Sequence, residues 1–117
     1  VVLAGDTHNA WTSQLRTTDG EIAGVEFGGC SVSSPGLDEV LGASNATLFT
    51  PFVLTLVDDL HFANLINRGY MHVAFTPTTV TATHRFVTTV TSRDYAVDEA
   101  ASRSFTVNRA DMLLPPK

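Results

Sequence analysis

The chain opens with the stretch VVLAGDTHNAW, residues 1–11. Its apolar run ends at Gly5 and is followed at once by Asp6 and His8. A short continuous apolar run is typical of a strand that is buried on both faces. Because strand side chains alternate, Asp6 and His8 project to the same side wherever the extended backbone continues. A carboxylate and an imidazole on one side of a strand end form half of a metal site.

The spacing of these residues leaves other interpretations open. Asp6 can simply cap the turn that follows the strand. Asn9 can orient a ligand or bind phosphate, but an ordinary turn hydrogen bond is the favoured interpretation. Asn9 is also a suitable N-cap for the one or two helical turns that we predict over residues 10–15. Trp11 is expected to pack rather than to form a platform for substrate.

Further short segments follow residues 1–11 in a characteristic order. They are VEF (25–27), SVSSPG (31–36), FANL (62–65), RGY (68–70), RFVTTV (85–90) and RDY (93–95). The ordered set spans nearly the whole chain. It resembles the C-terminal part of the PhoD-like alkaline phosphatases and phosphodiesterases, which belong to the calcineurin-like metallophosphoesterases.

This resemblance implies hydrolysis of phosphate esters by a metal centre in the full-length protein. The family motif Gly-Asp-x-His matches Gly5, Asp6, Thr7 and His8, so the resemblance makes Asp6 and His8 metal ligands. Two adjacent metals can bind a phosphoryl oxygen, lower the pKa of a bridging water and offset charge on phosphorus. The identity of the metal stays open among iron, zinc, manganese and calcium. Calcium would need more oxygen ligands than this chain offers.

The chain offers only two ligands in the expected place. Zinc sites in proteins use roughly three or four side-chain ligands, and no Gly-Asp-x-x-Asp or Gly-Asn-His-Asp/Glu motif occurs in the sequence. The first residue already lies in the apolar strand, and there is no initiating Met. We therefore expect residues 1–117 to be the C-terminal fragment of a metallophosphoesterase domain. Its partners would be a phosphate ester substrate and the missing N-terminal part of the same protein, and the isolated fragment would be inactive.

Composition narrows the class of protein further. The formal net charge is −5 and the seven basic residues are scattered, which argues against nucleic-acid binding. No apolar stretch approaches the roughly 18 residues that a membrane span requires. Charged residues make up only 16% of the chain, which fits a piece that buries part of its surface against a partner domain. The single cysteine, Cys30, excludes an internal disulfide, and we expect it to be a small buried thiol. A periplasmic or secreted location is implied by the resemblance alone.

The sequence pattern predicts an α+β, β-rich fold, with an antiparallel hairpin plus short helices. A strand over 21–27 follows the turn at Asp19-Gly20. We expect a helix over 37–41, a break over 43–47 and a second helix from Pro51 to Leu60. The hairpin pairs 70–75 with 79–90, and a polar connection over 93–102 leads to a last strand at 104–108. In the context of the resemblance, this is a C-terminal piece of a layered α/β metallophosphoesterase sandwich.

The sequence contains three further histidines, His61, His72 and His84. His72 and His84 can pair across the hairpin, and two cross-strand imidazoles can bind zinc. The favoured alternative is that both are ordinary half-buried strand histidines. His61 is expected on or near the second helix, in a structural role.

Two functional hypotheses remain. The first is the metal-dependent phosphatase or phosphodiesterase fragment, in which Asp6 and His8 are exposed at a strand end and not buried in the apolar core. The second is an autonomous β-rich structural or interaction module without catalysis, which a sealed core without exposed apolar surface would favour. The open edge at residues 1–5 also predicts a homodimer by strand pairing. No motif in the sequence identifies the substrate or indicates a preference for a monoester or a diester.

Overall fold

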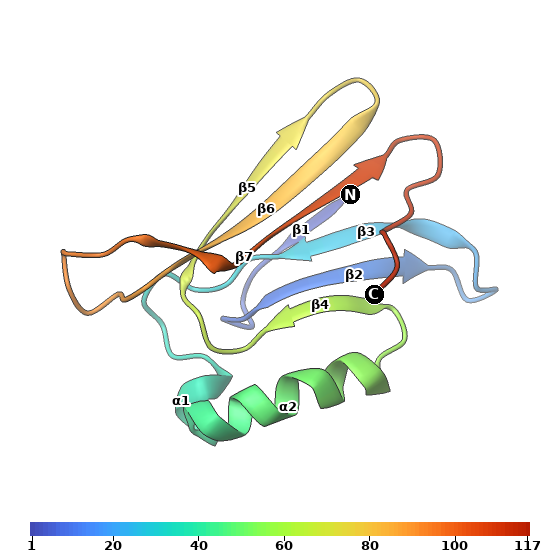
Figure 1. Cartoon of the computed structure of the whole chain (residues 1–117). Helices are drawn as coiled ribbons and strands as arrows, with labels where there is room; N and C mark the ends of the chain where they lie inside the picture. Colours follow the sequence, from blue (N-terminus) through green and yellow to red (C-terminus); the bar gives the residue numbers. More distant parts are fainter.

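Two β-sheets and a helical layer make up the molecule, and the computed structural model describes all residues 1–117 (Figure 1). The four-stranded sheet has the order β1-β3-β2-β4. Its strands are β1 (Val2–Ala4), β2 (Ala10–Arg16), β3 (Ile22–Gly28) and β4 (Leu60–Asn64). The three-stranded sheet contains β5 (Gly69–Phe75), β6 (Thr79–Val87) and β7 (Val97–Asn108) in that order. The helices are α1 (Leu37–Leu41) and α2 (Ala43–Leu56).

The two sheets pack face to face around the first of two hydrophobic clusters. This cluster takes its buried side chains from β3, β6, β7 and the C-terminal segment: Val25, Phe27, Val80, Ala82, Val107 and Leu114. Near it, His84 of β6 contacts Thr12 of β2 across the sheets, with His84 Nε2 and Thr12 Oγ1 2.9 Å apart. The ring of Phe62 on β4 lies 5.3 Å from that of His84. The sheets therefore share one apolar interface with a single buried polar link at its side.

The helices cover the other face of the four-stranded sheet, on the side of β4 (Figure 1). Ala46 of α2 is fully buried against Leu60, Ala63 and Leu65, and Trp11 packs on the same cluster. The structure thus has the order three-stranded sheet, four-stranded sheet, helices. The predicted β-rich α+β class is confirmed. Neither helix has the length and apolar character needed to cross a membrane.

The predicted helical turns over residues 10–15 are wrong, because this segment is the strand β2. It pairs with β3 on one side and β4 on the other. Thr12 and Gln14 face the sheet interface and are buried, whereas Trp11 faces the helices. Polar side chains at the buried positions hide the alternating pattern. Gln14 is tolerated there because its amide nitrogen donates to Gly24 O at 2.6 Å.

The predicted bounds of the second helix, Pro51 to Leu60, lie too far along the chain, because α2 spans Ala43–Leu56. The predicted break over 43–47 is helical, since α2 begins at Ala43, and Leu60 belongs to β4. Asn45 and Thr47 donate their side-chain hydrogens to carbonyl groups four residues earlier, at 2.7 and 2.8 Å, which reconciles them with the helix. His61 is not on a helix but on β4, the strand against which α2 packs, and its Nδ1 is 2.9 Å from Pro115 O.

The hairpin of β5 and β6 is confirmed, but the end of β6 and the start of the next strand differ from the prediction. Strand β6 stops at Val87 rather than residue 90, and β7 starts at Val97 within the predicted polar connection. His72 and His84 do not pair, because His72 lies opposite Thr83 and His84 lies opposite Met71. Neighbouring positions of a strand face opposite sides, so the two histidines point to different faces of the sheet. A zinc site between them is excluded.

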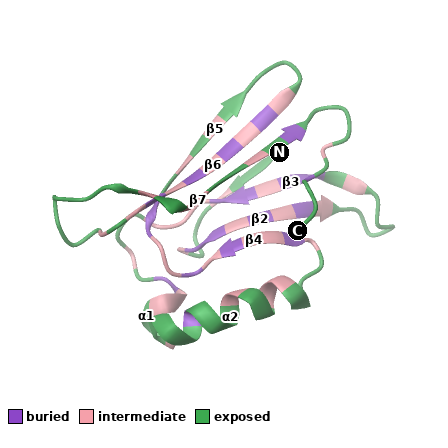
Figure 2. Cartoon of the chain, in the orientation of Figure 1, coloured by how far each residue is buried: buried purple, intermediate pink, exposed green.

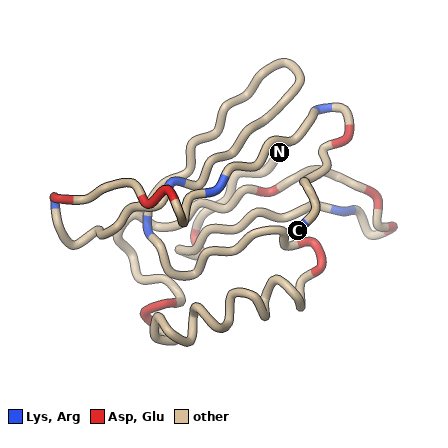
Figure 3. The backbone as a smooth tube through the Cα atoms, in the orientation of Figure 1, with Lys and Arg blue, Asp and Glu red and all other residues tan.

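The prediction that residues 1–5 are buried on both faces is wrong. Strand β1 is an edge strand whose only neighbour is β3, to which it runs parallel. Val2 and Leu3 are 44% and 53% exposed. Other exposed apolar residues lie in α2 and at the end of β5, among them Leu48, Phe52 and Phe75. Figure 2 shows that much of α2 and the end of β5 are exposed. Charged residues are sparse along the backbone, and the Lys and Arg positions are scattered over it (Figure 3).

Candidate metal-binding loop

The loop after β1 leaves the strand direction immediately. The Thr7 N–H donates to Gly5 O at 2.8 Å, which closes a tight turn around Asp6. Asp6 and His8 have φ angles of 70° and 61°, in the left-handed region that few residues other than glycine adopt. Extended backbone therefore does not set the directions of the two side chains. Strained backbone of this kind costs about 1–3 kcal/mol per residue, and it persists where the surroundings impose it.

Side-chain hydrogen bonds impose this conformation from both sides. Asn9 is 2% exposed, and its amide nitrogen donates to Thr7 O at 2.6 Å. Its amide oxygen accepts the Leu37 N–H at the start of α1 at 3.2 Å. The Trp11 indole N–H donates to Thr7 Oγ1 at 2.6 Å. The ordinary turn role of Asn9 and the packing role of Trp11 are thus confirmed, and neither side chain is free to bind phosphate.

His8 is held by a backbone carbonyl group. Its Nδ1 lies 2.7 Å from Pro35 O. Because a carbonyl oxygen only accepts, Nδ1 carries the hydrogen, and in the neutral ring Nε2 keeps its lone pair. Metal-binding histidines in proteins show this arrangement, in which the non-coordinating nitrogen donates to a carbonyl or carboxylate group. Asp6 is exposed and His8 half-buried, so neither lies in the apolar core.

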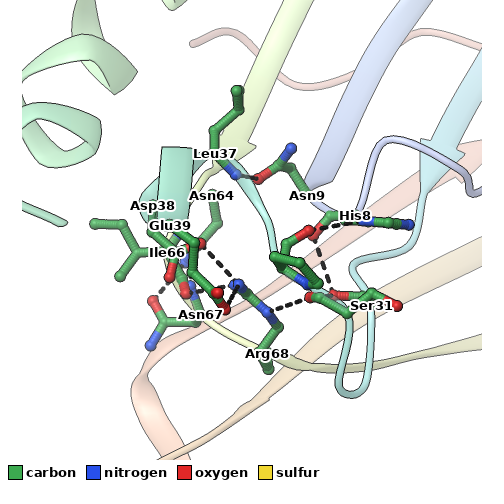
Figure 4. A network of polar contacts seen from close by, with 12 residues as sticks. His8, Asn9, Ser31, Leu37, Asp38, Glu39, Asn64, Ile66, Asn67 and Arg68 are labelled. Atoms are coloured by element: carbon green, nitrogen blue, oxygen red, sulfur yellow. Dashed lines mark hydrogen bonds and ion pairs between the residues drawn. The ribbon is translucent and has the colours of Figure 1, made fainter. Parts of the chain in front are cut away.

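The segment that carries Pro35 is fixed in turn by Arg68 (Figure 4). Arg68 Nε donates to Ser34 O at 3.0 Å, and its NH2 group donates to Asp38 Oδ1 at 2.7 Å. Ser31 also touches the candidate loop, since its N–H donates to His8 O at 3.4 Å. Residues far apart in the sequence thus form one polar network beside the loop.

The donor set fits part of a metal centre. Asp6 offers a carboxylate and His8 a bare imidazole nitrogen, which suits zinc, iron or manganese. Nowhere in residues 1–117 do three or more His, Cys, Asp or Glu side chains lie close enough to hold an ion. A complete site would need ligands in addition to these two.

A hollow of about 300 Å³ beside the network is not suited to phosphate. Asp38 and Glu39 line it together with Arg68, so carboxylates outnumber the guanidinium. Cys30, in the same region, is half-buried, and burial raises the pKa of its thiol. A neutral thiol at physiological pH fits the predicted structural role.

The chain is thus a β-rich α+β fold whose first strand leads into a loop with a carboxylate and an imidazole two residues apart. The family model described as PhoD-like phosphatase matches residues 1–84, and the chain belongs to this family. A solved structure described as "Structure of PhoD" superimposes with a TM-score of 0.71 and 25% sequence identity. That match covers 97% of this chain but 21% of the PhoD chain, so our chain spans about a fifth of its relative. No curated protein sequence matches the chain.

Sequence reasoning singled out Asp6 and His8 but missed the groups that support them. Pro35 and Arg68 both belonged to the ordered segments, as parts of SVSSPG and RGY, whereas Asp38 did not. The partners of Pro35 and Asp38 carry no signal in a single sequence, because they lie about thirty residues away along the chain. The position of Arg68 in its motif is explained by the network described above.

Proposed function

We propose that this chain contributes a metal-binding loop to a metal-dependent phosphatase or phosphodiesterase, with Asp6 and His8 as ligands. Membership of the PhoD-like phosphatases supports phosphoric ester hydrolysis as the activity of the whole protein. The observation that carries the residue assignment is the 2.7 Å contact between His8 Nδ1 and Pro35 O. That contact fixes the tautomer with a bare Nε2, and Asp6 lies exposed two residues away.

The bound metal would activate a water and stabilise charge on the phosphorus. The chain's own residues prepare the ligands. The strained turn presents Asp6, while Pro35 fixes the ring of His8. Holding both groups before the metal arrives reduces the conformational entropy lost on binding. The carboxylate and imidazole pair favours zinc, iron or manganese over calcium.

The remaining ligands and the substrate contacts would come from the rest of the protein. The chain spans about a fifth of the PhoD structure that it resembles, and the exposed apolar side chains of β1 and α2 suit a surface covered by further polypeptide. We also propose a periplasmic or secreted location, on family membership alone. A sealed core without exposed apolar surface would favour the alternative of an autonomous module, and the exposed Val2, Leu3 and Phe52 count against it.

The test is hydrolysis of a chromogenic phosphomonoester and a phosphodiester by the longer protein that contains this chain. We expect activity that a chelator abolishes. Because even outer partners of metal ligands cost about 10- to 100-fold when removed, Asp6→Ala and His8→Ala should each lower kcat/KM by at least about 100-fold. Asp19→Ala, which removes an exposed turn carboxylate, is the matched control and should leave activity unchanged. Metal-dependent activity that survives both loop substitutions would overturn the site. An inactive wild-type protein with every metal tried would favour the structural module.

A further inference from the structure

We propose that Arg68 is a positioning residue for His8. Through the carbonyl groups of Ser34 and Pro35, it holds the His8 imidazole in the orientation that leaves Nε2 free. This inference rests on the proposed role of His8 as a metal ligand. Arg68 itself touches neither metal nor substrate in this arrangement.

Arg68 is buried and its side-chain nitrogens are all engaged. The residue is 7% exposed. Nε donates to Ser34 O at 3.0 Å, NH1 to Ile66 O at 2.8 Å, and NH2 to Asp38 Oδ1 at 2.7 Å. Glu39 Oε1 lies 3.5 Å from the same NH2 group. A guanidinium whose three nitrogens all donate within the chain has little donor capacity left for a substrate phosphate, so we assign its role to the groups that it holds.

The path from Arg68 to His8 is short. Ser34 O accepts from Arg68 Nε and also from Ser31 Oγ, the latter at 2.7 Å. Pro35 follows directly, and its carbonyl oxygen accepts from His8 Nδ1. The proline ring fixes φ of Pro35, so the orientation of the Ser34 carbonyl restricts that of the next carbonyl. Losing the guanidinium would leave Ser34 O with the Ser31 hydroxyl as its one donor, and both carbonyls would be held less firmly.

Gly36 shows how closely these groups are assembled. A Cβ atom at this position would lie 3.0 Å from both Asn9 Oδ1 and Asp38 Oδ1. It would lie 3.2 Å from Arg68 NH1. Side chains from the metal-binding loop, α1 and the segment before β5 therefore converge on a single residue beside Pro35. The ion pair of Arg68 with Asp38 closes this arrangement.

The tautomer of His8 reports the proposed effect directly and without any metal. We would record long-range ¹H–¹⁵N correlations of the histidine rings in the chain 1–117 at about pH 8, where an ordinary histidine is neutral. The wild type should show His8 with its hydrogen on Nδ1. In Arg68→Met and Asp38→Asn, we expect this tautomer to be lost in part or entirely. Arg85→Met is the matched control, because Arg85 forms an exposed ion pair with Glu99, and it should leave His8 unchanged.

Arg68→Lys covers the case in which Arg68→Met does not fold. A lysine keeps the positive charge but cannot hold Ser34 O and Asp38 with separate nitrogens. The fraction of His8 that carries its hydrogen on Nδ1 should therefore lie between the values in the wild type and in Asp38→Asn. A fixed Nδ1–H tautomer in Arg68→Lys and Asp38→Asn, with the remaining spectrum folded, would overturn the proposal.

Kinetics of the longer protein separate this inference from the proposed function. For Arg68→Lys, we expect kcat to fall by about 10- to 100-fold with KM little changed, as for other groups that orient metal ligands. If the His8 tautomer changes in Arg68→Lys while His8→Ala is fully active, His8 is not a metal ligand but Arg68 still positions it. If the tautomer is unchanged in Arg68→Lys while His8→Ala is inactive, His8 keeps its proposed role and Arg68 does not position it.

Discussion

His84 is a histidine enclosed between two sheets, with Phe62, Phe86 and Phe105 around its ring. It is 1% exposed, and burial lowers its pKa from 6.5 to about 4. The contact with Thr12 satisfies the neutral ring but does not stabilise a charged one as a carboxylate would. Charging this ring inside the folded chain therefore costs free energy because the ring is buried.

We predict that this residue makes stability fall with acidity. Above pH 6.5 the ring is neutral in the folded and unfolded chain, so its contribution is fully present. Below pH 6.5 the unfolded chain takes up the proton first, and stability is lost until the pH reaches about 4. The total loss is about 3 kcal/mol. Urea unfolding at several pH values should show this slope, and His84→Phe combined with Thr12→Val should remove it. An equal slope in the double variant would contradict the assignment.

Gly69 is irreplaceable for a steric reason. A Cβ atom there would overlap Arg85 O and would approach Phe86 Cα to 2.9 Å. Both contacts are with the backbone of β6, the paired strand, which cannot move aside without breaking the pairing. We predict that Gly69→Ala lowers the free energy of unfolding by about 3 kcal/mol or more. Gly29→Ala is the control, since its nearest neighbour would be Ala4 O at an ordinary 3.9 Å, and it should change stability by less than about 1 kcal/mol.

Among the elements, α2 carries an internal weakness at Pro51. Proline has no N–H to donate to Thr47 O, so one helical hydrogen bond is missing. Pro51 is exposed and contributes little packing. We predict that Pro51→Ala raises the free energy of unfolding by about 1–2 kcal/mol, measured by urea denaturation. Thr55→Ala, which removes only a side-chain bond to Pro51 O, should change stability by about 0.5 kcal/mol at most. A less stable Pro51→Ala would mean that the ring packs.

Elements with local signals were predictable, and elements defined by distant partners were not. The helix at 37–41 and the strand over 21–27 appear within one residue of their expected bounds. Strand β2 was not predicted because the polar Gln14 occupies a buried position and breaks the expected pattern. The Gln14 side-chain oxygen accepts the Leu114 N–H at 3.0 Å, and that partner is 100 residues away in sequence. Asp6 and His8 could be proposed as ligands from spacing and family resemblance, but the bond from His8 to Pro35 spans 27 residues and has no local signature.

For the whole molecule, the uneven distribution of apolar side chains is the main feature. The sheet interface is sealed, with no buried side-chain polar atom left without a partner. In contrast, the edge strand β1 and the outer surface of α2 expose large apolar groups. Isolated exposed apolar residues are normal, but a group of them on an unpaired strand is a site for association. The candidate metal-binding loop begins directly at the end of this strand, so whatever covers β1 also approaches Asp6.

Strand pairing between two copies of the isolated chain is the last prediction. β1 offers unpaired backbone groups beside Val2 and Leu3, and the strand itself carries no charged side chain that would oppose pairing. We expect sedimentation to show a concentration-dependent dimer. Val2→Lys combined with Leu3→Lys should make the chain monomeric at concentrations where the wild type pairs, because lysines on an edge strand oppose pairing. Ser44→Lys with Ser92→Lys adds the same charge at exposed positions on α2 and between β6 and β7, and should leave the dimer intact. A wild-type chain that stays monomeric over the whole concentration range would show that the edge is protected without a partner.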